Sequence, residues 1–425
     1  MKKIILIITL FVNSIFANAQ WVEANVPVNK LIAINGCVFL TKDSIVAWDM
    51  GSSYLSTDGG YNFTLWPENK FGGADFISKV SENNWRVCRN GSSEINASND
   101  NGNSWSSIYI TNRNDTLFKN SGIRIAHFFN EKNGFVLGDK VDNCYQVFNT
   151  SDGGKTWQKL NCDSIKIPNY ERLFFTFFET VYNFNGEVWF RPISKYDGNK
   201  IIRVRNYGLQ VDTIEIQEGK FVQSMTFEDA YNGIAILTDT GNNVLKYLYK
   251  TNDGGKTWNE LTNNSSVTNP YGITSFKNKF NKTFYLILGS DGLKYSTNGG
   301  DNWIEIDKLR HRKIYPLDEN NMISLFNESG NDNNLRVFTG KILAVNQINN
   351  NQKLQGLFPN PACNIINIDE NSVSYSIYNS TGKLVLSNKI NNDFEVNIES
   401  LKSGIYFIEI LTHKGDLHLI KFVKE

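Results

Sequence analysis

Short apolar stretches separated by Gly, Asn and Asp run along the chain from residue 21 to about residue 346. Two of them share an outline: residues 128–137 and 227–236 each begin with a Phe, reach a Gly six positions later and continue as an apolar strand. Short strands that alternate with turn residues in this way are typical of an all-β fold. We interpret each of these two stretches as a pair of neighbouring inner strands in a repeating unit.

A second element, an eight-residue turn, recurs five times between such strands. Its Asp or Asn caps the turn through its own side chain, Gly supplies the positive φ of a tight reversal, and the closing Trp or Phe offers a large apolar face at the start of the next strand. Each copy, called a box turn below, therefore predicts a β-hairpin. The central residues are Asp58, Asp100, Asp152, Asp253 and Asn298; the glycine two positions later is Gly60, Gly102, Gly154, Gly255 and Gly300; and the closing aromatic residue is Phe63, Trp105, Trp157, Trp258 and Trp303.

The spacing of the box turns counts the repeating units. Successive central residues are 42, 52, 101 and 45 positions apart, so the third gap holds two units, and one unit lacks a box turn. A period of about 40 to 50 residues with four short strands in each period indicates a β-propeller. We predict seven blades, while a count of six or eight also fits the spacing. The predicted blades are 31–66, 74–109, 123–160, 173–217, 222–261, 272–306, and 312–346 together with 21–26.

Residues 20–25 carry a trace of ring closure. They resemble the strand that follows a box turn, as in residues 156–161, but no turn precedes them. The last blade has inner strands at about 335–343 and no aromatic box turn after them. An N-terminal strand that completes this blade would cover an edge otherwise open to aggregation, so we predict that residues 20–346 form a closed propeller.

The box turns resemble the Asp box, the Ser-x-Asp-x-Gly-x-x-Trp element of sialidases, sortilin-type receptors, some glucan hydrolases and photosystem-assembly-factor-like propellers. In those families the box is structural and joins the two outer strands of a blade, far from the ligand. The resemblance therefore implies that Asp58, Asp100, Asp152 and Asp253 are not catalytic.

The chain changes character after residue 346. Residues 347–356 are polar and Asn-rich, which indicates a linker. From residue 357 onward two prolines bar a regular ladder at the start, and alternating stretches at 373–378 and 405–411 are separated by Gly-containing turns. This pattern predicts a small β-sandwich of about seventy residues.

Residues 357–425 resemble the type A sorting domain of type IX secretion. The resemblance implies that secretion machinery in the outer membrane of a Bacteroidetes-type bacterium reads this segment, and that the protein is released or tethered to surface lipopolysaccharide. An ordinary carbohydrate-binding or immunoglobulin-like module is the alternative. The residues that carry the resemblance are Pro359, Asn360, Pro361, Gly382, Gly404 and Tyr406.

The first nineteen residues have the pattern of a signal peptide. Lys2 and Lys3 precede an apolar run at 4–12, and residues 17–19 form a small-x-small cleavage site, so the mature chain is expected to begin at Gln20 after Sec export to the periplasm. The run is about half of the roughly 20 residues that span a bilayer, and no later run is long enough, so we expect no transmembrane segment after cleavage. We therefore predict a secreted or surface-attached protein, and a monomer.

The five cysteines, an odd number, do not form a disulfide framework in a chain of 425 residues. Cys144 and Cys162 are each nine positions from Gly153, so a hairpin that turns there would place them opposite each other on neighbouring strands, within bridging distance. The alternatives of a bridge and of two unpaired, half-buried thiols both remain open.

Candidate chemistry is sparse. A sialidase needs an arginine cluster, a tyrosine nucleophile assisted by Glu, and an acid/base Asp, and this pattern is missing from the sequence. In the blade without a box turn, Glu179 lies in an aromatic run near Arg172, where it could be an acid with a raised pKa or, more ordinarily, the end of a strand paired with Arg. No metal-ligand spacing or phosphate loop is present, so we predict no metal site and no cofactor.

Charge completes the functional prediction. With 43 basic and 43 acidic residues the chain has no overall field for nucleic acid. We predict a non-catalytic propeller that binds a protein or glycan through loops around its axis, with a glycan-active hydrolase as the alternative. The partner of residues 357–425 is expected to be the type IX secretion machinery.

Overall fold

The computed structural model describes most of the propeller and of the C-terminal segment. The described residues are all-β apart from two short 3-10 helices, and the predicted fold class of seven four-stranded blades is confirmed. In the described part of the chain no helix has the length and apolar character needed to cross a membrane. The described residues are 21–27, 34–66, 70–89, 91–110, 122–167, 182–184, 186–190, 200–239, 245–261, 267–326, 334–339, 360–368, 372–380, 383–390, 394–412 and 417–425.

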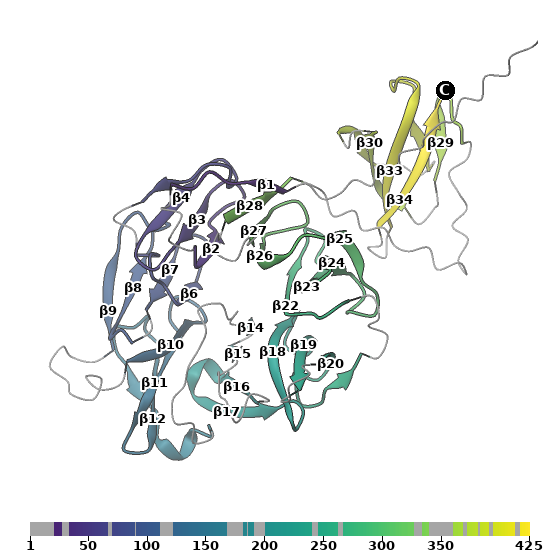
Figure 1. Ribbon diagram of the computed structural model, residues 1–425. Coiled ribbons are helices and arrows are strands. Elements are labelled where there is room, and N and C mark those ends of the chain that lie inside the picture. Colours follow the sequence, from purple (N-terminus) through teal and green to yellow (C-terminus); the bar gives the residue numbers. More distant parts are fainter. Residues whose placement is uncertain are drawn as a thin grey trace, which may run out of the picture. The chain divides into compact units, whose positions relative to one another are not determined.

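Seven antiparallel sheets follow one another around a ring (Figure 1). Within each of the first six blades the strands pair in chain order, so the first strand is innermost and the fourth is outermost. Blade 1 comprises β2 (Gly36–Phe39), β3 (Ile45–Trp48), β4 (Ser53–Ser56) and β5 (Thr64–Leu65); blade 2 comprises β6 (Phe76–Lys79), β7 (Trp85–Cys88), β8 (Glu94–Ser98) and β9 (Ser106–Tyr109); blade 3 comprises β10 (Ile123–Phe128), β11 (Gly134–Val141), β12 (Cys144–Thr150) and β13 (Gln158–Lys159).

The remaining blades lie close to their predicted ranges. Blade 4 comprises β14 (Tyr182–Phe184), β15 (Glu187–Phe190), β16 (Lys200–Arg205) and β17 (Gln210–Glu215); blade 5 comprises β18 (Lys220–Phe227), β19 (Gly233–Asp239), β20 (Lys246–Thr251) and β21 (Asn259–Glu260); blade 6 comprises β22 (Gly272–Lys277), β23 (Thr283–Gly289), β24 (Gly292–Ser296) and β25 (Ile304–Asp307); blade 7 comprises β26 (His311–Pro316), β27 (Met322–Phe326) and β28 (Asn334–Phe338), completed by β1 (Trp21–Glu23).

The predicted ring closure is present. Strand β1 pairs with β28 in antiparallel register, Trp21 opposite Phe338 and Val22 opposite Val337, and so becomes the outermost strand of blade 7. Strand β1 therefore covers the edge of the last blade, which would otherwise be open to pairing with another chain.

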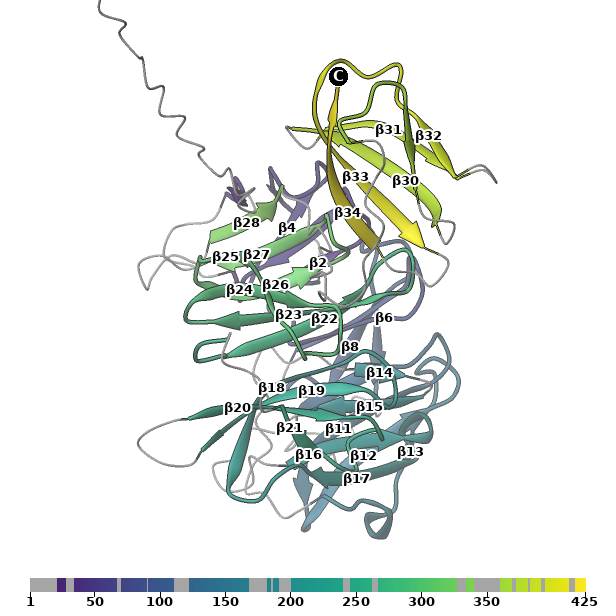
Figure 2. The same ribbon diagram turned by 90° about the vertical axis from the view of Figure 1, so that its right-hand side faces the viewer.

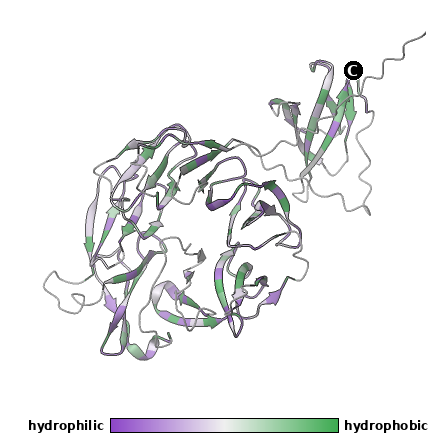
Figure 3. Cartoon of the chain, viewed as in Figure 1, coloured by the Kyte–Doolittle hydropathy of each residue, from purple (hydrophilic) through white to green (hydrophobic). Residues whose placement is uncertain are grey.

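Apolar residues from adjacent blades form the core. The second strands are almost fully buried, for example Ile234–Leu237 in β19 and Leu286–Ile287 in β23, and hydrophobic colour follows the inner strands in Figure 3. Each cluster joins two blades: one contains Phe135 of blade 3 with Val188 and Phe190 of blade 4. This packing of apolar side chains between adjacent sheets holds neighbouring blades together.

The C-terminal segment forms two sheets that share one core (Figure 2). Buried Ile366 and Val396 of the small sheet lie in the same cluster as Ile377, Ile408 and Phe422 of the large one, which is the sandwich predicted. The small sheet pairs β29 (Ile365–Asn367) with β32 (Glu395–Asn397), and the large sheet has the order β31 (Leu384–Lys389), β30 (Ser372–Asn379), β33 (Gly404–Thr412) and β34 (Leu417–Lys424).

Candidate functional site

The box turns are closed networks of local hydrogen bonds. In blade 3 the Thr150 hydroxyl donates to Asp152 Oδ1 (2.9 Å), and the backbone N–H and hydroxyl of Thr156 donate to the two carboxylate oxygens of Asp152 (2.9 and 2.6 Å). The Gly154 N–H donates to the Thr150 hydroxyl oxygen (2.8 Å). Hydrogen bonds from Thr156 lower the pKa of Asp152 to about 2. The carboxylate is thus held ionised and saturated, as a structural cap is.

Each of four box turns is also fastened to the first hairpin turn of its own blade. The Gly153 N–H donates to the Lys132 carbonyl (2.8 Å), and the Gly254 N–H donates to the Tyr231 carbonyl (2.9 Å). Blades 1 and 2 repeat the contact through Gly59 and Asn101. The turns between strands one and two and the box turns therefore occupy one face of the ring, which we call the box face.

Blade 4 makes the same contact without a box turn. Its third and fourth strands are joined by η2 (Asn206–Gly208), and the Tyr207 N–H donates to the Gly186 carbonyl (3.0 Å). Tyr207 has a left-handed conformation (φ 56°), and its ring packs edge-on against Phe129 of blade 3. Blade 4 therefore keeps the backbone fastening and adds an aromatic contact with the neighbouring blade. Glu179 and Arg172, the predicted candidates in this blade, lie outside the described residues.

A Ser-His-Asp arrangement that the sequence did not reveal joins His311 and Ser324 of blade 7 to Asp307 at the end of blade 6. His311 Nδ1 is 2.6 Å from Ser324 Oγ, and His311 Nε2 is 3.0 Å from Asp307 Oδ1. Asp307 Oδ2 also accepts from the Trp21 indole N–H (2.7 Å). Ser324 and His311 are both fully buried. A nucleophile must reach its substrate, so this group is a fastening for β1, which we call the closure latch, and not a catalytic triad.

The face opposite the box face carries ion pairs at the ends of inner strands. Arg124 of β10 binds Asp139 of β11 through two hydrogen bonds (2.8 and 2.6 Å), and Lys220 of β18 binds Asp239 of β19 (2.8 Å). The Lys220 side chain lowers the pKa of Asp239. These carboxylates are acceptors already occupied by cations. Among the described residues no three His, Cys, Asp or Glu side chains gather as a metal site would require.

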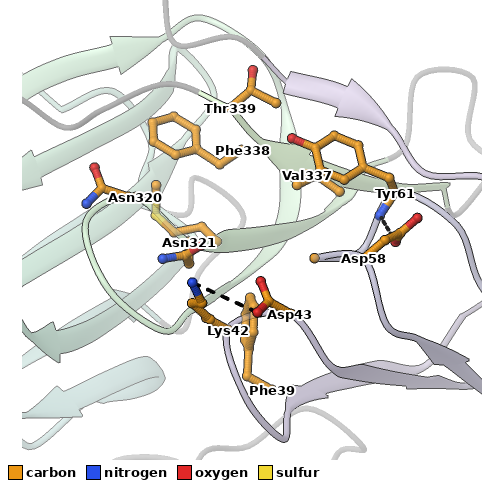
Figure 4. A pocket seen from close by; sticks show the side chains of 12 residues that line it. Phe39, Lys42, Asp43, Asp58, Tyr61, Asn320, Asn321, Val337, Phe338 and Thr339 are labelled. Carbon is orange, nitrogen blue, oxygen red and sulfur yellow. Dashed lines mark hydrogen bonds and ion pairs between the residues drawn. The ribbon is translucent and has the colours of Figure 1, made fainter. Parts of the chain in front are cut away.

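A pocket of about 350 Å³ opens on the box face between blade 7 and blade 1, and we call it the seam pocket (Figure 4). Its buried side comprises Met322, Val337 and Phe338, while Tyr61 and Asn320 at its rim are exposed. The combination of apolar floor and polar rim is that of a small-molecule site at the lower end of the usual size range. The other lining residues are Phe39, Lys42, Asp43, Asp58, Gly59, Asn321 and Thr339.

Cys144 and Cys162 form a disulfide, with their Cα atoms 5.6 Å apart. Cys144 begins β12, but β13 ends at Lys159, so Cys162 lies in η1 (Cys162–Ser164) and not on the neighbouring strand. The bridge therefore ties the connection between blades 3 and 4 to blade 3. Cys37 and Cys88 are buried free thiols, and Cys363 is an exposed one.

In the C-terminal segment, the residues that resemble the sorting domain connect its two ends. The Asn360 side chain donates to the Lys421 carbonyl (3.2 Å) and accepts from the Val423 N–H (3.0 Å). The Tyr406 hydroxyl donates to the Lys402 carbonyl (2.8 Å). The opening of the segment is thereby paired with its last strand. Pro361 and Gly404 are among the described residues, whereas Pro359 and Gly382 are not.

Comparisons with known proteins give different results for the C-terminal segment and for the propeller. Residues 356–425 match the family described as the secretion system C-terminal sorting domain, and no curated protein matches the sequence. YCF48 bound to a D1 peptide is similar with a TM-score of 0.52 and 13% identity over 76% of this chain and 97% of that one. PorZ, a surface component of the type-IX secretion system of Porphyromonas gingivalis, has a TM-score of 0.48 and 12% identity over 92% of this chain and 59% of PorZ. An ancestral GH74 enzyme has a TM-score of 0.46 and 13% identity, over 94% and 63%.

The likeness to YCF48, at 13% identity, supports the propeller fold alone, while the match at the C-terminus supports an export route. Residues 356–425 are a type IX secretion sorting domain, and the chain is a β-propeller protein that this domain directs to secretion or to attachment at the outer-membrane surface.

Proposed function

We propose that the exported propeller is a non-catalytic binding protein whose ligand is a protein or a glycan. The observation that supports this proposal is the direction in which the pKa values of its aspartates are shifted. Glycoside hydrolysis needs one carboxylic acid with a raised pKa beside a second, ionised one. Among the described residues, every aspartate whose pKa is displaced has it displaced downward. These aspartates are Asp58, Asp100, Asp152, Asp229, Asp239, Asp253 and Asp291.

The seam pocket supports binding as well. Its rim offers amide, ammonium and carboxylate groups, and its floor is apolar, so that it provides contacts for recognition on a rigid ring. The YCF48 propeller was solved with a peptide bound to it, which adds an example of a ligand on this fold.

The test is to incubate the exported full-length protein with an array of glycans and, separately, with cross-linked surface proteins of its own bacterium, while products released from the glycans are measured. We expect retention of a ligand without release of product. Release of shortened glycans would overturn the proposal, and so would the absence of any retained glycan or cross-linked protein. Heat-unfolded protein is the control for adhesion to the array.

A further inference from the structure

The two walls of the seam pocket are held together by the first residues of the propeller. Val337 and Phe338, on one wall, are the register partners of Val22 and Trp21 in β1. Just after β1, the Asn25 N–H donates to the carbonyl of Tyr61 on the other wall (2.8 Å). Residues 21–25 therefore bridge blade 7 and blade 1 at the pocket itself.

The bridge continues beyond Tyr61. The Asn25 carbonyl accepts from the Phe63 N–H (2.8 Å), and the Asn25 side chain donates to Asn62 Oδ1 (3.3 Å). The closure latch fixes the other end of the segment, because Trp21 donates to Asp307. If residues 21–25 were detached, β28 and the box turn of blade 1 would lose the segment that sets their separation, and the pocket would lose its shape.

Hydrogen bonds orient the amide rim of the pocket in advance. Asp318 accepts from the backbone N–H groups of Asn320 and Asn321 (2.8 and 2.9 Å) and from the side-chain amide of Asn321 (2.9 Å to each oxygen). The Asn321 amide group is thereby fixed through its NH₂, which leaves its carbonyl oxygen for a ligand. Lys42 and Asp43 are exposed lining residues from blade 1, and Lys42 Nζ is 3.9 Å from Asp43 Oδ2 (Figure 4). This is a loose pair that can exchange partners with a ligand.

The pocket suits a neutral group with hydroxyls at its edge and an apolar face. The rim carries donors, such as the Lys42 ammonium, and acceptors, such as the Asp43 carboxylate, which suits hydroxyl groups because each hydroxyl both donates and accepts. Phe39, which is half-buried in the pocket wall, offers aromatic surface to an apolar face. Two carboxylates, Asp43 and Asp58, against the single ammonium of Lys42 disfavour an anionic ligand. A pyranose ring has this combination of features, and about 350 Å³ accommodates a ring of that size.

We infer that the seam pocket binds one neutral saccharide residue, and that it does so only in the ring closed by residues 21–25. This inference rests on the proposed function and specifies the ligand class. Saccharide binding and ring closure are then linked, since a ligand that binds only the closed ring stabilises it.

The first experiment measures binding by calorimetry and by thermal shift with N-acetylglucosamine, methyl β-galactoside and methyl α-mannoside as probes. We expect at least one probe to bind wild-type protein, and Asn320→Ala or Asp43→Asn to weaken it about 3- to 10-fold, the loss of one hydrogen bond. The matched control is Lys132→Ala, since Lys132 occupies the position of Asn320 in the first hairpin turn of blade 3 and its N–H is likewise capped, by Asn130. It is expected to bind as wild type.

Three outcomes would overturn the inference: no probe binds, the Asn320 and Asp43 variants bind as tightly as the control, or peptides bind in the pocket and sugars do not. If the protein retains arrayed glycans and the Asn320 variant does too, the proposed function stands and the pocket assignment fails. If nothing is retained at all, the proposed function fails with it.

The second experiment tests the link to closure. Trp21→Phe keeps an aromatic ring at this position and removes the indole donor to Asp307, and Trp21→Ala removes both. We expect both variants to lose probe affinity, whereas Trp157→Ala, a comparable loss in the box turn of blade 3, keeps the affinity of the folded protein. Equal affinity in folded Trp21→Phe and wild type would contradict the link.

Discussion

Replacing Gly153 by Ala tests whether the box turn is a fastening to the first hairpin turn. Gly153 has φ of 78°, and a Cβ there would lie 2.8 Å from the Glu131 carbonyl oxygen, where ordinary contacts begin at 3.4 Å. Holding alanine in the left-handed region costs about 1–2 kcal/mol. Relieving the clash moves the turn away from blade 3's first hairpin and weakens the Gly153 to Lys132 hydrogen bond, which contributes about 0.5–1.5 kcal/mol.

The expected loss of unfolding free energy for Gly153→Ala is therefore about 2–3 kcal/mol. Gly219→Ala is the matched control, because Gly219 has a similar φ of 73° but no atom within 4 Å of a Cβ, so only the conformational cost applies. Urea denaturation followed by tryptophan fluorescence gives the two values. If Gly153→Ala is no more destabilising than Gly219→Ala, the contact with the first hairpin turn does not fasten the blade.

Three further outcomes are expected. Removing the disulfide with Cys144→Ser should cost about 3 kcal/mol for a separation of 18 residues, measured as unfolding free energy against the disulfide-bonded wild type under non-reducing conditions, and equal stability of the two would contradict this. Burial lowers the pKa of His127 to about 3, below its value of about 6.5 in the unfolded chain. The stability that neutral His127 contributes is therefore complete above about pH 6.5 and is lost as the pH falls toward 3. His127→Gln should flatten this part of the plot of unfolding free energy against pH, and an unchanged slope between pH 7 and 4.5 would contradict this expectation. Deleting residues 356–425 should leave the protein inside the cell envelope, and its appearance in the medium or at the surface, by fractionation, would refute the export assignment.

The blade architecture could be predicted because its determinants are local. Asp152 and Gly154 form hydrogen bonds with residues a few positions away, so the local sequence is enough to predict the hairpin. Closure by residues 20–25 could be predicted for a related reason: a strand sequence without a preceding turn needs a partner, and the last blade lacked one. Because the box turn recurs at nearly regular spacing, the blades could also be counted from the sequence.

The candidate site could not be predicted in the same way. The closure latch joins Trp21 to residues 286 positions away, and no short motif contains Asp307, His311 and Ser324 together. The seam pocket likewise combines residues from both ends of the propeller. The sequence could predict that Cys144 and Cys162 lie close together, but not that Cys162 lies outside the sheet. Strand β13 is only two residues long, and the chain has left the sheet by Cys162.

The pairing of β1 with β28 has a consequence for the order of folding. Trp21 is made first and its partners on β28 almost last, so the contact has a very high sequence separation, and its loop-closure entropy cannot be offset until nearly the whole propeller exists. Six blades can form from consecutive strands as the chain emerges, but the seventh waits for both ends. A nascent or partly translocated chain is thus an open arc with an unpaired edge, and its protection from association with other chains begins only when the last blade is complete.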